Sequence, residues 1–316
     1  MILVTTCPVS DRHLARIREI APDLDIRVHT SIAEAQDDLP HAELLLTYGE
    51  DLTQDVMDRC KNLKWIPVIS AGLELMPFAA IAARDILVTN ARGIHKGPMA
   101  EHTMGLLLLF ARRFLPMYRN QLQANWDRSV RLDELDGQTL GVIGAGSIGT
   151  EIAKRAKAFG MRTLGVARSK RPSEPFDEMF DVSGLDELLQ RSDFVVVITP
   201  QTPETEGLIG ERELGLMKRS AVLINIARGV VVDEAALLKA LQDGTIAGAA
   251  LDVFTEEPLP SDHPFWQLEN CFLTPHISSR SPKYMERAQE IFRHNLRVYV
   301  TGQGEMINVI DPQKGY

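Results

Sequence analysis

A glycine-rich segment near the middle of the chain has the spacing of a phosphate-binding loop. Gly144, Gly146 and Gly149 fit the pattern G-x-G-x-x-G, with Ser147 and Ile148 between the last two glycines. The segment follows an apolar stretch of strand type and opens an amphipathic helical stretch, which is the context that a dinucleotide site requires. The first glycine allows a tight turn, the second a close approach to a pyrophosphate, and the third close packing of helix against strand. The phosphates would lie at a helix N-terminus, where N–H groups and the helix dipole favour anions. A glycine-rich turn without a ligand is the competing interpretation.

The residues after the next expected strand bear on which dinucleotide would bind. Sites that prefer NAD usually place an acidic residue about 20 residues beyond the glycines, but Ala167 stands at this point. A basic run follows, comprising Arg168, Ser169, Lys170 and Arg171. Arginine can bind a phosphate through paired donors, and a serine hydroxyl can add a hydrogen bond. We therefore predict that NADP(H) is preferred and NAD(H) possible, with Arg168 as the main contact, supported by Ser169 and Lys170. A solvated charged loop is the alternative.

Alternating strand-like and helical stretches would position these segments. Short apolar stretches of strand type fall at residues 2–4, 26–29, 44–47, 65–69, 140–143, 163–166, 194–198, 221–226, 247–251 and 271–274. Helical stretches fall at residues 11–20, 98–115, 147–159 and 282–300. This alternation predicts an α/β fold with parallel sheets that are covered on both faces. The pattern restarts at Thr139 and the last helix could return to the first unit. We therefore expect a discontinuous first domain, 1–98 with 283–316, and a second domain, 99–282.

Bulk composition excludes several classes of protein. The 316 residues are 45% hydrophobic and 24% charged, as in ordinary globular domains. A formal net charge of -9 argues against a nucleic-acid partner. Cys7, Cys60 and Cys271 are too few and too scattered for a disulfide framework, and no cluster has metal-ligand spacing, so we predict no metal. The N-terminus lacks signal-peptide features, and the most apolar helical run, 104–111, is too short to span a bilayer. We expect a soluble, cytoplasmic protein that does not bind membranes.

Together with the glycine segment, five stretches in a fixed order resemble the D-isomer-specific 2-hydroxyacid dehydrogenase family. They are Ser70–Leu73, Met99–Thr103, Asn225–Gly229, Leu251–Phe254 continuing to Glu257–Pro258, and Thr274–Ile277. The resemblance covers essentially the whole chain. It implies an NAD(P)-dependent oxidoreductase that interconverts a small 2-keto acid and its D-2-hydroxy acid, such as glyoxylate or hydroxypyruvate. It also implies two doubly wound parallel-sheet domains, with a Rossmann dinucleotide-binding domain inserted into a flavodoxin-like substrate domain.

The resemblance implies a catalytic set of Arg228, Glu257 and His276. Arg228 would bind the substrate carboxylate and keto oxygen, His276 would be the acid/base residue, and Glu257 would be its carboxylate partner. This chemistry is reasonable in itself. Reduction of a keto acid needs a proton as well as a hydride, and an imidazolium can give that proton near neutral pH. A carboxylate partner favours the charged imidazole, and an arginine fork matches a carboxylate and stabilises charge that develops on the carbonyl oxygen.

The resemblance implies further binding residues outside the catalytic set. The substrate carboxylate would be bound by the backbone of Ala71, Gly72 and Leu73. The cofactor would be contacted by Asp252 at the nicotinamide amide and flanked by Thr199, Pro200 and Ala227. Tyr48 follows a strand-like stretch and either faces the substrate or is a surface aromatic. Ser278 and Ser279 depart from the glycine and small residue that commonly follow the histidine.

Two other functions remain open, and the resemblance also implies a partner. A dinucleotide-sensing interaction protein of the same fold is one alternative, and a peptide-binding cleft would distinguish it. Phosphoglycerate dehydrogenase is the other. Formate dehydrogenases carry glutamine where Glu257 stands, which argues against formate. The resemblance implies a homodimer, with residues 112–136, including Trp126, as part of an arm that packs on the partner.

Overall fold

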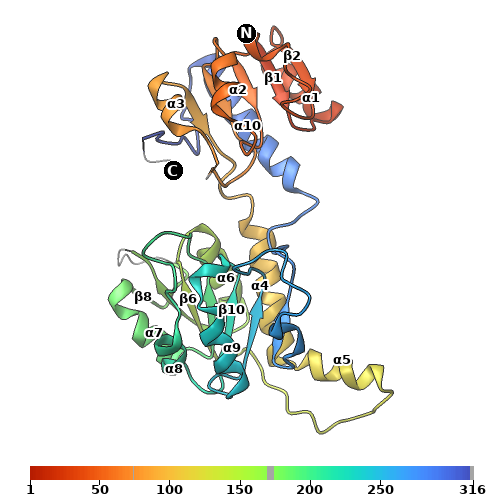
Figure 1. Ribbon diagram of the computed structural model, residues 1–316, viewed down its shortest axis with the longest axis vertical. Helices are drawn as coiled ribbons and strands as arrows, with labels where there is room; N and C mark the ends of the chain where they lie inside the picture. Colours follow the sequence, from red (N-terminus) through yellow and green to blue (C-terminus); the bar gives the residue numbers. More distant parts are fainter. Residues whose placement is uncertain (74, 169–173, 314–316) are drawn as a thin grey trace. The chain divides into compact units, whose positions relative to one another are not determined.

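The computed structural model describes residues 1–73, 75–168 and 174–313. The chain divides into two compact units, which are called unit 1 (Met1–Ile94 with Ser281–Tyr316) and unit 2 (His95–Arg280) (Figure 1). The limits expected after Pro98 and after residue 282 therefore lie slightly too far along the chain. The first differs because helix α4 (Lys96–Ala111) begins before Pro98 and belongs wholly to unit 2.

Unit 1 is built on a parallel sheet of five strands with the order β2-β1-β3-β4-β5. The strands are β1 (Ile2–Thr6), β2 (Asp25–His29), β3 (Leu44–Leu46), β4 (Trp65–Pro67) and β5 (Leu87–Thr89). This order is that of flavodoxin-like doubly wound domains, as the resemblance implies. The helices are α1 (Asp11–Ile20), α2 (Gln54–Arg59), α3 (Phe78–Ala83) and the late helix α10 (Tyr284–Thr301).

Alternation of side chains along the strands gives unit 1 its two apolar layers. In β1, Val4 packs into the layer that includes Val56 of α2 and Ile81 of α3. Its neighbour Leu3 packs into the opposite layer, with Ile17 of α1 and with residues of α10. Successive residues of a strand point to opposite faces, so a run of apolar residues can bury both faces.

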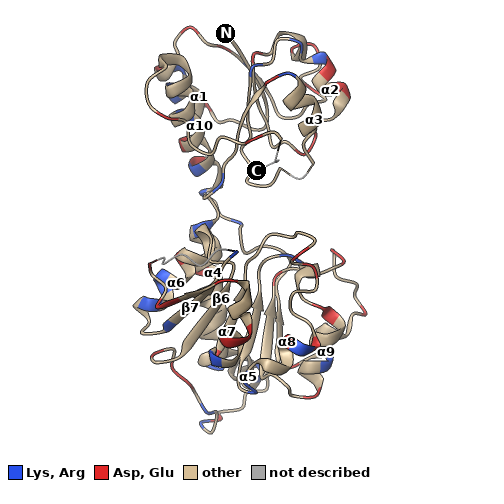
Figure 2. Cartoon of the chain, turned by 90° about the vertical axis from the view of Figure 1, so that its left-hand side faces the viewer, with Lys and Arg blue, Asp and Glu red and all other residues tan. Residues whose placement is uncertain are grey.

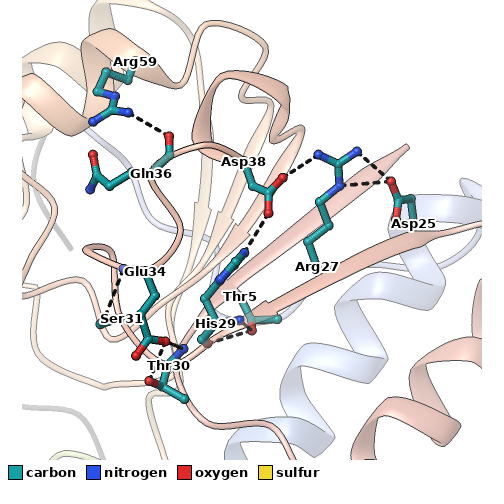
Figure 3. Close-up of polar contacts among 10 residues, drawn as sticks. All are labelled: Thr5, Asp25, Arg27, His29, Thr30, Ser31, Glu34, Gln36, Asp38 and Arg59. Carbon is teal, nitrogen blue, oxygen red and sulfur yellow. Dashed lines mark hydrogen bonds and ion pairs between the residues drawn. The ribbon is translucent and has the colours of Figure 1, made fainter.

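The edge strand β2 is held by a polar network (Figure 3). Arg27 bridges two carboxylates, with Nη1 donating to Asp38 Oδ1 at 2.6 Å and Nη2 to Asp25 Oδ2 at 3.0 Å. His29 Nε2 lies 2.8 Å from the other oxygen of Asp38. Charged side chains on an edge strand oppose pairing with a further strand from another chain. The network thus ties β2 to the 31–41 segment and protects the sheet edge.

Unit 2 is built on a parallel sheet of seven strands with the order β12-β11-β10-β9-β6-β7-β8. The strands are β6 (Thr139–Ile143), β7 (Arg162–Val166), β8 (Glu178–Phe180), β9 (Phe194–Val197), β10 (Val222–Asn225), β11 (Gly248–Leu251) and β12 (Cys271–Leu273). The chain runs outward from β6 in one direction and from β9 in the other. The switch point between β6 and β9 is where open α/β sheets bind ligands, beyond the carboxyl ends of the strands.

Helices cover both faces of the unit 2 sheet (Figure 2). One layer contains α4 and α6 (Ser147–Ala158), and the other contains α7 (Leu185–Arg191), α8 (Glu211–Leu216) and α9 (Glu234–Gln242). Val195 and Val197 of β9 face the second layer, while Val196 faces the first. The prediction of two parallel-sheet α/β domains is confirmed. Among the described residues, no helix is long and apolar enough to cross a membrane.

Several elements of the structure differ from the sequence prediction. The helices α2, α3, α7, α8 and α9 were not predicted. The strands β5 and β8, each at an edge of its sheet, were also not predicted. The helix expected over 98–115 is two helices, α4 and α5 (Phe114–Leu122). They are separated at Arg113, whose φ of 54° is left-handed and cannot continue an α-helix.

Candidate active site

The loop after β6 has the shape that a phosphate-binding turn needs. Gly144 has φ 109°, and a Cβ there would lie 2.6 Å from the carbonyl oxygen of Ile198, so only glycine fits. A Cβ on Gly149 would lie 2.4 Å from the carbonyl oxygen of Gly144, which shows how closely helix α6 packs against the loop. No atom lies within 4 Å of a Cβ built on Gly146. The backbone at Gly146 is therefore open to a ligand.

The start of α6 can receive an anion. Gly146 is the N-cap residue of α6 and has no side chain that could cap the helix. The first hydrogen bond of the helix runs from the Thr150 N–H to the Gly146 carbonyl oxygen, at 2.8 Å. The N–H groups of Ser147, Ile148 and Gly149 precede that bond and are the unsatisfied donors of a helix start. In the turn after β9, Thr199 Oγ1 is buried and has no hydrogen-bond partner among the described residues. An orphaned hydroxyl beside a cradle of N–H groups fits a bound dinucleotide.

The ribose end of the site is only partly described. The Ala167 N–H donates to Phe180 O at 3.1 Å, and Arg168 is exposed just beyond it. Ser169 and Lys170 lie outside the described residues. Glu204 lies within electrostatic reach of Arg168. The pKa of Glu204 is lowered, mainly by the Thr202 hydroxyl and to a smaller extent by Arg168.

A buried aspartate organises the loop after β12. Asp252 is 0% exposed, and its Oδ1 accepts from Thr274 Oγ1 at 2.6 Å and from the Ile277 N–H at 2.9 Å. Its Oδ2 accepts from the Ser278 N–H at 2.9 Å. The His276 N–H donates to the Asp252 carbonyl oxygen at 2.8 Å. Both carboxylate oxygens are thus engaged by the loop that carries His276, a positioning role that the resemblance did not indicate.

His276 and Glu257 are in direct contact. His276 Nδ1 lies 2.7 Å from Glu257 Oε2, and because a carboxylate can only accept, Nδ1 carries the hydrogen. Glu257 Oε1 accepts from the Phe254 N–H at 2.9 Å, so both of its oxygens are used. The side chains of His276 and Glu257 are 44% and 35% exposed. His276 has φ 50°, an uncommon conformation that the hydrogen bonds to Asp252 hold in place.

Arg228 follows the neighbouring strand. Asn225 at the end of β10 shapes the turn, because its side chain accepts from the Ala227 N–H and donates to the Arg228 carbonyl oxygen, both at 3.1 Å. Arg228 is exposed, and its Nη1 donates to Ala227 O at 2.7 Å. Gly229 is buried against the backbone of Phe254, where a Cβ would lie 1.9 Å from the carbonyl carbon. The turn of Arg228 therefore packs directly on the segment that leads to Glu257.

The order of the sheet explains how these residues gather. The strands β10, β11 and β12 are adjacent and parallel, so the segments after them leave the sheet at the same edge. Arg228, Glu257 and His276 each follow one of these strands. His102 Nε2 lies 3.4 Å from Thr274 Oγ1, and burial lowers the pKa of His102. Asn225 and Thr274 were inside the recognised motifs, but only contacts in the structure show what they do.

The loop that resembles a carboxylate-binding element lies in unit 1. Ser70 Oγ lies 2.8 Å from the carbonyl oxygens of both Tyr48 and Gly72, which joins the ends of β3 and β4. The Asn90 side chain donates to Ala71 O at 2.9 Å. Among the described residues, the N–H groups of Ala71, Gly72 and Leu73 have no hydrogen-bond acceptor. Successive unpaired N–H groups can bind an anion.

Other expected residues have the following positions. Tyr48 is half exposed and its hydroxyl lies 4.0 Å from Met285 Sδ. Pro200 accepts the Thr205 hydroxyl at 2.8 Å through its carbonyl oxygen. Among the described residues, no group of three or more His, Cys, Asp or Glu side chains could hold a metal ion.

Comparison with known proteins identifies the family. The family model described as D-isomer specific 2-hydroxyacid dehydrogenase, NAD binding domain, matches residues 104–278, more than half of the chain. The chain belongs to the D-isomer specific 2-hydroxyacid dehydrogenase family. It is therefore an oxidoreductase of 2-hydroxy acids with a nicotinamide dinucleotide cofactor, as the sequence predicted.

Individual relatives have different names within this family. A glyoxylate reductase of Thermofilum pendens is 38% identical over 82% of this chain and 78% of the relative. A D-3-phosphoglycerate dehydrogenase of Methanocaldococcus jannaschii is 34% identical over 95% of this chain, which spans 58% of that protein. The crystal structure of a D-isomer specific 2-hydroxyacid dehydrogenase from Xanthobacter autotrophicus, in complex with NADPH and MES, has a TM-score of 0.82. It is 30% identical, with 100% of this chain and 99% of that chain covered.

Proposed function

We propose that the protein reduces a small 2-keto acid to its D-2-hydroxy acid with NADPH, with glyoxylate and hydroxypyruvate as the first candidates. The observation that carries this proposal is the 2.7 Å contact between His276 Nδ1 and Glu257 Oε2. It lies at the carboxyl edge of the same sheet whose β6 leads into the phosphate-binding turn. When bound, the reduced nicotinamide supplies the hydride, and the chain's own residues supply the rest.

His276 is the proton donor in this proposal. Because Glu257 occupies Nδ1, Nε2 is the nitrogen that is left to give a proton to the keto oxygen. Glu257 accepts the hydrogen on Nδ1 and so holds the ring in one orientation. The three hydrogen bonds to the Asp252 side chain keep the histidine loop in place throughout.

Arg228 and the unit 1 loop are the proposed anion-binding elements. The guanidinium of Arg228 is exposed after β10 and can match a carboxylate with two parallel hydrogen bonds. It would also stabilise negative charge on the keto oxygen as the hydride arrives. The N–H groups of Ala71, Gly72 and Leu73 would bind the substrate carboxylate through backbone donors alone. Tyr48 remains a predicted substrate contact.

The preference for NADPH is supported by the absence of an acid after β7. Ala167 stands where a carboxylate would repel a 2′-phosphate, and the exposed Arg168 follows it. The NADPH complex of the Xanthobacter relative shows that a family member binds this form. Ala227 and Asp252 remain predicted contacts of the nicotinamide half, alongside Thr199 and Pro200. For Asp252, the two engaged oxygens favour an indirect role through the histidine loop.

A homodimer in the cytoplasm completes the proposal. Helix α5 has no buried residue, and Trp126 in the segment that follows is 90% exposed. The segment 112–136 carries further exposed apolar side chains, and a second copy of the chain would cover them. Cys7, Cys60 and Cys271 are all free and buried, which suits a reducing compartment.

The direct test is reduction of 2-keto acids followed at the absorbance of the reduced nicotinamide. Glyoxylate, hydroxypyruvate and 3-phosphohydroxypyruvate are each mixed with NADPH and, separately, with NADH. We expect turnover with NADPH, slower with NADH, and a fall in kcat of roughly 10²- to 10⁴-fold in His276→Ala. Arg228→Lys should mainly raise KM, because an ammonium cannot form the paired bonds. His41→Ala is the matched control, since His41 is exposed in unit 1.

The outcomes separate the alternatives. Faster turnover with NADH would refute the role of Arg168 and leave the catalytic set intact. A strong preference for 3-phosphohydroxypyruvate would indicate a phosphoglycerate dehydrogenase, the name of the Methanocaldococcus relative. Tight binding of either dinucleotide without turnover of any acid would refute the reductase and favour a dinucleotide-sensing protein.

A further inference from the structure

A small pocket in unit 1 lies beside the loop that we assign to the substrate carboxylate. It is lined by Gly72 and Leu73 of that loop, by Gly49 and Glu50 after β3, and by Met76. The volume is about 100 Å³, well below the roughly 300–1,000 Å³ of sites for drug-sized ligands. A substituent of only a few atoms can therefore enter it. Because Gly72 and Leu73 line the pocket and also belong to the proposed carboxylate site, a substituent on the third carbon of a bound acid can reach it.

Contacts between the loops after β3 and β4 hold the lining of the pocket in place. The Ser70 hydroxyl, 2.8 Å from both Tyr48 O and Gly72 O, links the two loops. Gly49 has φ 91°, and a Cβ there would lie 3.2 Å from Val68 Cγ1 and 3.3 Å from Met76 Sδ. The turn that carries Glu50 is thus packed closely against β4. These contacts fix the backbone of the turn relative to the Ser70 loop, and Glu50 extends from this turn as an exposed side chain.

The charge of the pocket is negative. Glu50 is the only ionisable side chain among the described residues that line it. Its carboxylate lies within electrostatic reach of two phenols, those of Tyr48 and Tyr284. Burial is the main cause that raises the pKa of Tyr284 to about 12, and Tyr48 and Glu50 add to it. The Tyr284 hydroxyl donates to Ile69 O at 2.8 Å, at the base of the Ser70 loop. The field of Glu50 therefore extends across the carboxyl ends of β3 and β4.

We propose that Glu50 selects the substrate by the charge and hydrogen bonding of the group on its third carbon. A hydroxyl group there would donate to the Glu50 carboxylate in a charge-assisted hydrogen bond. A phosphate or second carboxylate would be repelled by the same group. The substrate class is then an uncharged, hydroxylated or unsubstituted 2-keto acid, such as hydroxypyruvate or glyoxylate. This inference rests on the proposed reductase function and goes beyond it, because the proposed catalytic set acts only on groups that every 2-keto acid shares.

The test is the ratio of kcat/KM for hydroxypyruvate to kcat/KM for 3-phosphohydroxypyruvate. The native protein should favour hydroxypyruvate by at least tenfold. Glu50→Gln removes the charge and should lower the ratio by about tenfold, the size expected for one partly screened charge pair. Glu50→Lys should lower it further, because attraction replaces repulsion. Glu19→Gln is the matched control: Glu19 is an exposed acid of α1 outside the pocket, and its substitution should leave the ratio unchanged.

The result can be separated from that of the proposed function. Glyoxylate has no third carbon, so its turnover by the native protein tests the reductase alone. If glyoxylate is reduced but the ratio is the same in the native, Glu50→Gln and Glu50→Lys proteins, the role of Glu50 is refuted and the reductase stands. A native protein that reduces 3-phosphohydroxypyruvate better than hydroxypyruvate would also overturn the inference. Absence of turnover with every acid would refute both.

Discussion

Replacement of Gly229 by alanine should damage both the stability of unit 2 and its catalysis. A Cβ at this position would lie 1.9 Å from the carbonyl carbon of Phe254 and 2.2 Å from the nitrogen of Thr255. Ordinary van der Waals contact requires about 3.4 Å or more, so one backbone must move by over an ångström. The Phe254–Thr255 backbone resists, because the two N–H groups donate to Glu257 Oε1 at 2.9 Å and to Glu234 Oε1 at 2.7 Å.

The magnitude follows from overpacking of a buried site, which costs typically 1–3 kcal/mol. Because the clash is with backbone that is tied by hydrogen bonds, we expect the upper end, about 3 kcal/mol. The displacement would also move the turn of Arg228 against the segment of Glu257, and a misplacement of about 1 Å can cost roughly 10²-fold in rate. Urea unfolding followed by circular dichroism measures the first effect, and kcat/KM for glyoxylate reduction measures the second.

The control is Gly215→Ala in α8. Gly215 is exposed, and no atom lies within 4 Å of a Cβ at that position. Alanine is the better helix former there, so a gain of roughly 0.5–1 kcal/mol is expected. If Gly229→Ala unfolds at the same urea concentration as the native protein and keeps native activity, the inferred close packing of the Arg228 turn on the Glu257 segment is refuted.

Three further predictions concern other parts of the molecule. Asp252→Asn replaces one carboxylate oxygen, most simply the one that accepts from the Ser278 N–H, with an NH₂ group that cannot accept. The free energy of unfolding, measured with urea, should fall by about 1.5–3 kcal/mol. A smaller fall would show that the carboxylate does not hold the histidine loop. The hydrogen bond from Arg191 is the main cause that lowers the pKa of Glu178 to about 2, from 4.5. Its stabilisation is complete above pH 4.5 and is lost as the pH falls toward 2, so Glu178→Gln should lower the Tm at pH 6 more than at pH 3; an equal loss at both pH values would contradict this. Trp126→Ser should shift the protein toward monomer in analytical ultracentrifugation, and a native protein that is already monomeric at micromolar concentration would refute the dimer.

The geometry of the glycine-rich turn was predictable because it depends on local residues. The spacing of Gly144, Gly146 and Gly149 between a strand and a helix is a property of six consecutive residues. Each glycine has a separate steric reason, and the structure shows two of them as clashes that a Cβ would make. The charge run after β7 was equally visible, although Ser169 and Lys170 lie outside the described residues.

Some local features could not be predicted in the same way. The break between α4 and α5 depends on one left-handed residue, Arg113, which is neither glycine nor proline. The strands β5 and β8 were missed although β3, β4 and β12, which are equally short, were predicted. They form by pairing with β4 and β7 at the edges of their sheets. In each case tertiary contacts, not intrinsic preference, select the conformation.

The sequence by itself determined the α/β class, the family and the identity of the residues that could do the chemistry. These follow from residue type and spacing, which short stretches of chain record completely. Only the tertiary structure decided which of them meet, because β10, β11 and β12 bring together residues that are far apart in the chain. It placed His276 against Glu257 and enclosed Asp252 beneath the histidine loop. It also turned Glu50, an unremarked acid in the sequence, into the charge of a small pocket, since a pocket exists only where separate loops pack.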